Sequence, residues 1–190
     1  MIVAVEKADY DGAEHAEPLL QQADGLSLDE LPGRKLERRE LIRLVSALGA
    51  DEARWRSEVA FSDDTRHYVS LYRDEHVDVW LLCWTPSNDT GWHDHDQSSG
   101  AVAVLQGELV EHNLLIGRPS LATAIPAGQT YCFGPEHIHR LTGLAPGSVS
   151  IHAYSPPLSR LGQYTVGAGG VLRRVSVSYV DELRPLDDMI

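Results

Sequence analysis

Short segments of strand-like composition follow one another at even spacing from residue 65 to residue 180. They are rich in β-branched, aromatic and other apolar residues, and Gly, Pro, Asn, Asp or Ser residues separate them. The expected strands cover residues 66–72, 77–84, 100–105, 107–115, 121–125, 129–133, 148–154 and 171–180. This spacing is typical of a small antiparallel barrel, so it predicts an all-β fold for residues 65–180.

The first 64 residues show helical periodicity in place of alternation. Residues 1–26 are polar and weakly periodic, so we expect an arm with a short helix near Leu19 and Leu20. A helix is predicted over residues 35–48, with Gly49 as its stop, because one face is apolar. That face consists of Leu41, Leu44, Val45 and Leu48.

Two shorter helical signals flank this helix. Ser27 begins a capping box that Pro32 limits to a single turn, and Asp51 is placed to cap a second helix that carries Trp55 and Val59. We therefore expect residues 1–64 to form an arm and a helical layer packed on the barrel, within one structural domain. Residues 181–190 are expected to be a loose acidic tail.

The composition restricts the classes of partner and compartment. A formal net charge of −12 argues against nucleic acids and anionic membrane surfaces. The chain has no apolar run of about 18 residues, and its first residues lack the pattern of a signal peptide. Cys83 and Cys132 lie in apolar runs, as reduced buried thiols do, with a disulfide between them as the alternative. We expect a cytoplasmic protein that binds neither nucleic acid nor membranes.

A histidine pair, His93 and His95, is the strongest chemical signal in the chain. On a strand, residues two apart point to the same face, so both imidazoles can reach one metal ion. A second polar patch contains His137 and His139, either of which can supply a third ligand. Imidazole suits Fe, Zn, Ni and Cu. The alternative is a set of surface histidines without a metal.

The residues around these histidines resemble the two-part cupin signature. It is carried by Gly91, His93, His95, Gly100, Gly107, Pro135 and His139. The resemblance implies a jelly-roll barrel in which the histidine pair and a later histidine come from facing strands. Gly100 stands where cupins carry a glutamate ligand, which leaves a three-histidine site.

A narrower resemblance, over residues 66–160, is to the cysteine dioxygenase family. It rests on His93-Asp94-His95, the Val102–Gly107 segment, His139-Arg140 and the Ser148–Pro157 segment. It implies a non-haem Fe(2+) enzyme that adds both atoms of O2 to a small thiol and forms a sulfinate. The family places its third ligand directly before an arginine, which selects His139 over His137.

The family also carries a relay of three residues two apart, which correspond here to Ser150, His152 and Tyr154. The resemblance implies that the phenol points at the iron-bound substrate, that the histidine orients the phenol, and that the serine orients the histidine. On spacing alone, a polar stripe on a strand is the alternative. Animal members crosslink the tyrosine to a cysteine whose position is Gly100 here, so Tyr154 is expected to be unmodified.

The substrate-binding residues depart from the family pattern. Cysteine dioxygenases hold the substrate carboxylate with an arginine two residues after a tyrosine; the tyrosine corresponds to Tyr68 and the arginine position holds Ser70. Arg66 would share the strand face of Ser70, Arg73 would lie on the opposite face, and Arg160 could reach the site from a loop. We therefore expect the substrate to be L-cysteine or a mercapto-acid such as 3-mercaptopropionate.

Two other function classes compete with a thiol dioxygenase. One is a non-catalytic cupin that senses or binds a small molecule, and the other is a different metal-dependent cupin enzyme. The histidine set and the Ser-His-Tyr pattern favour the dioxygenase. The expected partners are the small thiol and O2, and the chain is expected to be a monomer or a weak homo-oligomer.

Overall fold

The computed structural model describes residues 17–18, 25–115, 119–167 and 171–178. The helix expected near Leu19 and Leu20 and the tail expected at residues 181–190 lie outside these ranges.

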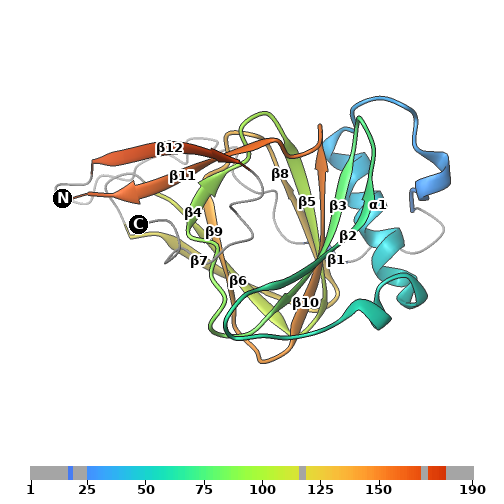
Figure 1. Cartoon of the computed structure of the whole chain (residues 1–190), viewed down its shortest axis with the longest axis horizontal. Helices are drawn as coiled ribbons and strands as arrows, with labels where there is room; N and C mark the ends of the chain where they lie inside the picture. Colours follow the sequence, from blue (N-terminus) through green and yellow to red (C-terminus); the bar gives the residue numbers. More distant parts are fainter. Residues whose placement is uncertain (1–16, 19–24, 116–118, 168–170, 179–190) are drawn as a thin grey trace, which may run out of the picture.

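Two antiparallel six-stranded sheets face each other and enclose the barrel interior (Figure 1). The first sheet runs in the order β1 (Glu17–Pro18), β8 (Gln129–Phe133), β5 (Ser99–Gln106), β10 (Ser148–Ser155), β3 (Asp78–Trp84) and β2 (His67–Arg73). The second runs β12 (Leu172–Ser178), β11 (Arg160–Val166), β4 (Trp92–Asp94), β9 (His139–Gly143), β6 (Glu108–Asn113) and β7 (Leu121–Pro126). This arrangement is the predicted all-β jelly roll.

Strand β10 lies between the helical layer and the barrel interior, and every one of its residues is buried. Its odd-numbered side chains, such as Ile151, pack toward helix α1 (Arg38–Ala50), whose Leu41 and Leu44 are fully buried in the same cluster. Its even-numbered side chains point into the barrel, where Tyr154 joins an apolar cluster drawn from both sheets. The predicted helical layer therefore covers the outer face of the first sheet (Figure 1), and truncating one of its buried leucines to alanine costs about 2–5 kcal/mol.

The helix boundaries differ from the predicted ones. Helix α1 starts at Arg38, since the Glu40 carboxylate accepts the Glu37 amide at 2.8 Å, and it continues through Gly49 to Ala50. The prediction of a second helix was wrong, because the residues after Asp51 form two 3-10 turns, η3 (Glu52–Arg54) and η4 (Arg56–Glu58). The buried Trp55 separates the turns, and its indole donates to the Gly49 carbonyl at 3.2 Å. The single turn after Ser27 is present as η2 (Leu28–Glu30).

Three strands of the second sheet, β4, β9 and β11, were not among the expected strands. They are short or follow Pro- and Gly-containing turns, and their pairing with neighbours defines them better than their composition does. Cys83 and Cys132 are buried and form no disulfide within the described residues. No described helix has the length and hydropathy needed to span a membrane.

Candidate metal centre

Three buried histidines converge between the sheets, and we call His93, His95 and His139 the histidine triad. Strand β4 pairs with β9 so that His93 lies directly opposite His139. The three ring centroids are 4.7–5.0 Å apart, and one nitrogen of each ring lies within 4.8 Å of the others. The triad is almost inaccessible to solvent, with exposures of 2% or less. The sequence-predicted ligands are therefore brought together.

The ring nitrogens of the triad are arranged for a metal ion. Nδ1 of His93 donates to the Gly91 carbonyl at 3.1 Å and Nδ1 of His139 donates to Glu111 at 2.8 Å, so the lone pair of each ring is on Nε2. Nε2 of His139 and both nitrogens of His95 have no hydrogen-bond partner among the described residues. Buried polar atoms without partners are costly, and a bound metal ion would satisfy Nε2 of His139 and one nitrogen of His95.

Burial keeps His95 and His139 in the neutral form that binds metals. It lowers the pKa of His139 to about 3, although the hydrogen bond to Glu111 acts in the opposite direction. It also lowers the pKa of His95 well below the usual range, and the neighbouring His93 adds to this effect. A donor set of three imidazoles suits a borderline divalent metal.

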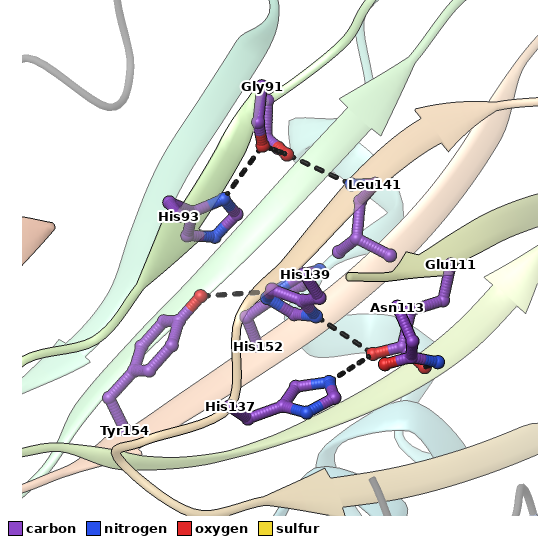
Figure 2. A network of polar contacts seen from close by, with 10 residues as sticks. Gly91, His93, Glu111, Asn113, His137, His139, Leu141, His152 and Tyr154 are labelled. Atoms are coloured by element: carbon purple, nitrogen blue, oxygen red, sulfur yellow. Dashed lines mark hydrogen bonds and ion pairs between the residues drawn. The ribbon is translucent and has the colours of Figure 1, made fainter. Parts of the chain in front are cut away.

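His137, the alternative third ligand, lies outside the triad. It precedes β9, so it does not share a strand face with His139 as the spacing had allowed. Its Nε2 donates to Glu111 at 3.0 Å (Figure 2). Its ring stacks on Phe133 with centroids 5.6 Å apart.

The predicted Ser-His-Tyr residues form a continuous hydrogen-bonded chain along the inner face of β10. Ser150 Oγ lies 2.9 Å from His152 Nε2, and His152 Nδ1 lies 3.2 Å from the Tyr154 hydroxyl. The indole of Trp84, which the sequence did not mark as functional, donates to Ser150 Oγ at 2.9 Å. Burial, with Arg66 nearby, lowers the pKa of His152 well below its usual range, so the ring is neutral.

A row of paired residues crosses the first sheet at the level of the triad. Tyr154 pairs with Asp78 on one side and with Gly100 on the other, and Gly100 pairs with Phe133. The Phe133 ring stacks on His95 at 4.5 Å and also fills the space beside Gly100. A Cβ atom at Gly100 would meet that ring at 2.4 Å, so Phe133 occupies the place of a side chain at this position.

The substrate-binding residues expected from the sequence do not lie together in one place. Tyr68 and Ser70 lie at the exposed edge of the first sheet, and Tyr68 contacts Trp80 edge-on at 5.7 Å. Arg66 is buried, with its guanidinium 4.6 Å from the centre of the Trp84 ring. Arg160 is exposed, donates to Ser176 at 3.0 Å, and does not join these residues.

The expectation for Arg73 was wrong, because β2 contains an irregularity between Ser70 and Tyr72. The extra residue reverses the alternation, so Arg73 pairs with Asp78 and shares its face. Arg73 donates to Asp78 at 2.5 Å and to the Leu158 carbonyl at 3.1 Å. Arg73 therefore extends the row that contains Tyr154.

Asp94, between His93 and His95, anchors the segment that carries them to the hairpin of β11 and β12. Its carboxylate accepts from Arg174 at 2.7 Å, from Tyr164 at 2.6 Å and from the Gly162 amide at 3.0 Å. Burial acts to raise the pKa of Asp94, but these hydrogen bonds lower it to about 2. Strands β11 and β12 thus hold the histidine turn from outside the barrel.

Sequence reasoning did not mark Glu111, Phe133 or Trp84 as members of the site. Glu111 lies 28 residues before its partner His139, and nothing in the spacing links them. Phe133 and Trp84 sit in apolar runs, where an aromatic residue predicts a core position. The only available signal was the alternation of β3 and β8, which places both rings on the inner face.

Comparisons with known proteins agree with this architecture. A protein from Klebsiella pneumoniae, described as an uncharacterized conserved protein with a double-stranded beta-helix domain, superposes with a TM-score of 0.50 at 17% identity, covering 56% of this chain and 84% of that one. A cupin superfamily protein from Desulfitobacterium hafniense gives 0.45 at 13% identity, covering 54% and 87%. The model of cysteine dioxygenase type I matches residues 26–166, which contain the triad and the β10 chain. Since this match spans well over half of the sequence, the chain belongs to the cysteine dioxygenase type I family.

Proposed function

We propose that the chain is a mononuclear non-haem iron(II) thiol dioxygenase that converts a small carboxylate-bearing thiol and O2 to the sulfinate. One observation carries the proposal: a buried triad of neutral histidines lies against the tyrosine end of the Ser150–His152–Tyr154 chain. The ring centroids of His95 and Tyr154 are 5.3 Å apart. The predicted metal ligands and a phenol are thus adjacent, as a reaction at a metal-bound substrate would require.

His93, His95 and His139 would hold the metal. Bound iron(II) would supply the redox chemistry and the coordination positions for a thiolate and O2. The protein contributes three uncharged ligands, so the charge of the ion stays available to the thiolate. Burial of the triad excludes water and strengthens the polar interactions made inside it.

The hydrogen-bond chain gives Tyr154 a defined direction. Trp84 has only an N–H to donate, so Ser150 Oγ accepts from it and directs its own proton to Nε2 of the neutral His152. Nδ1 of His152 then carries the remaining proton and donates to the Tyr154 oxygen. The phenol would direct its own proton toward the reacting groups, where it would stabilise developing negative charge.

Arg73 is the arginine that supports a carboxylate-bearing substrate best. It reaches the row of Tyr154 through the irregularity in β2, whereas Arg66 lies on Trp84 and Arg160 donates to Ser176 on β12. A guanidinium binds a carboxylate through two parallel hydrogen bonds. We propose that Arg73, paired with Asp78, contacts the carboxylate and that Tyr68 and Ser70 line the approach.

Oxygen uptake by anaerobically iron-loaded protein tests the proposal, with L-cysteine, 3-mercaptopropionate and cysteamine supplied separately. We expect uptake with a carboxylate-bearing thiol, one O2 per sulfinate formed, and no uptake by His139→Ala. Tight iron binding without uptake for any thiol would refute the dioxygenase and favour a small-molecule sensor. Turnover of a substrate that is not a thiol would favour a different metal-dependent cupin enzyme.

A further inference from the structure

Glu111 is a buried carboxylate beside the triad, and the thiol-oxidation proposal assigns it no role. It lies on β6 and is 3% exposed. Its Oε1 atom is 2.8 Å from His139 Nδ1 and 3.0 Å from His137 Nε2 (Figure 2). Asn113 lies 3.4 Å from the other oxygen. A single carboxylate oxygen therefore joins a predicted metal ligand to a histidine outside the triad.

The protonation of this cluster follows from its geometry. One oxygen of the Glu111 carboxylate, Oε1, faces a ring nitrogen of His139 at 2.8 Å and a ring nitrogen of His137 at 3.0 Å. An ionised carboxylate only accepts hydrogen bonds, so both histidine nitrogens that face it must carry protons. His139 is thereby fixed as the Nδ1–H tautomer with its Nε2 lone pair turned toward His93 and His95.

We propose that Glu111 and His137 are positioning residues of the metal centre. Glu111 selects the tautomer and the ring orientation of His139, and His137 holds Glu111 by occupying the same oxygen. Without that second donor, the carboxylate is free to rotate away from His139. The added negative charge also makes His139 a stronger donor than a ligand held by a neutral carbonyl, as His93 is. This inference rests on the proposed metal site and adds its supporting residues.

A second metal site is the rival explanation of the same cluster. One ligand atom each of Glu111, His137 and His139 lies within 4.8 Å of the others. The two short hydrogen bonds to Oε1 favour the positioning role, because their protons occupy the space between the donor atoms. The two explanations predict different numbers of bound ions per chain.

The test compares wild-type protein with Glu111→Gln, Glu111→Leu and His137→Gln, and uses Glu108→Gln as a control. The glutamine side chain in Glu111→Gln keeps an accepting oxygen without the charge, whereas Glu111→Leu removes the acceptor. Glu108 lies on the same strand, half-exposed, and outside the cluster. The first readout is the tautomer of His139 in metal-free protein, from ¹⁵N chemical shifts of the imidazole nitrogens. The second is Zn²⁺ affinity and stoichiometry, from competition with a chromophoric chelator.

We expect the Nδ1–H tautomer in wild-type, Glu111→Gln and Glu108→Gln protein, and loss of that preference in Glu111→Leu. Zn²⁺ should bind at one ion per chain, about 100-fold more weakly in Glu111→Leu and about tenfold more weakly in Glu111→Gln and His137→Gln. The control should bind like wild type. If Glu111→Leu does not fold, Glu111→Gln and His137→Gln still decide, since unchanged affinity in both overturns the inference.

Three further outcomes separate this inference from the proposed function. Two ions per wild-type chain, with one lost in Glu111→Leu, would show that the cluster binds a metal itself and would overturn the positioning role. No Zn²⁺ binding by wild-type protein would refute the metal site on which the positioning role rests. An unchanged His139 tautomer in Glu111→Leu, with Zn²⁺ bound normally, would refute the positioning role and leave the metal site intact.

Discussion

Replacing Gly100 by alanine tests how tightly the first sheet and the metal centre are packed together. The new Cβ atom would lie 2.4 Å from Cε2 and Cζ of Phe133, about 1 Å inside the separation of ~3.5 Å at which carbon atoms pack. Phe133 is fully buried and stacked on His95, with its centroid 4.9 Å from that of His139. The ring therefore has to move against two predicted ligands.

The expected cost is that of overpacking a core, about 1–3 kcal/mol in the free energy of unfolding. For a chain of this size, that corresponds to a Tm lowered by about 2–12 °C. Because the displaced ring contacts His95 and His139, Zn²⁺ affinity should fall as well. Gly134→Ala is the matched control, since a Cβ there meets no atom within 4 Å.

The measurement is urea unfolding of metal-free Gly100→Ala, Phe133→Leu and the double variant. The smaller leucine makes room for the alanine, so the double variant should be more stable than the two single effects predict. The coupling energy should be about 0.5–3 kcal/mol. Additive effects, or a Gly100→Ala protein as stable as Gly134→Ala, would show that Phe133 does not press on this position.

Three other predictions concern the chemistry. Tyr154→Phe should lower kcat about 10²–10³-fold at unchanged iron content. Trp84→Phe should lower kcat less, because it removes only the donor at the far end of the hydrogen-bond chain. Equal kcat in both variants and in wild type would refute a role for this chain. Arg73→Met should raise KM about 10–100-fold for a carboxylate-bearing thiol, as expected for loss of hydrogen bonds to a charged group. Any turnover of cysteamine, which has no carboxylate, should be unchanged. A uniform effect on both thiols would show that Arg73 does not recognise the carboxylate. The pKa of His139 is about 3 in the folded chain against an ordinary value of 6.5. Between these two pH values the unfolded state binds more protons than the folded state. The free energy of unfolding therefore falls as the pH falls, by about 1.4 kcal/mol per pH unit for each such histidine. The urea midpoint of metal-free protein should therefore drop between pH 6.5 and pH 5, and a constant midpoint would contradict the buried, neutral triad.

The features that sequence predicted correctly depend on local patterns. Alternation and turn residues predicted most strands of the barrel, and the spacing of His93 and His95 predicted that the two rings lie close together. The apolar face of α1 was sufficient to locate the helix, because burial against β10 reinforces its periodicity. These signals are repeated every two to four residues, so one exception does not hide them.

The features that sequence missed depend on single residues or on distant partners. The alternation rule placed Arg73 on the wrong face because one extra residue in β2 reverses the count. Spacing also left His137 and His139 equivalent, since it does not show that β9 begins only at His139. Only the pairing of β4 with β9 places His139 opposite His93, and the contacts of Glu111 with both histidines exist only after β6 and β9 have paired.

Each histidine of the triad is oriented by a different kind of contact. The three histidines should therefore differ in how strongly mutations of their neighbours affect them. A backbone carbonyl holds His93, a buried carboxylate holds His139, and ring packing between Phe133 and Tyr154 holds His95. No side-chain substitution removes the carbonyl, so His93 should be the most robust ligand. His139 loses its orientation with one substitution on β6, whereas His95 depends on packing and tolerates gradual changes of volume. Variation at Glu111 should therefore affect the metal more than variation of similar size at Phe133.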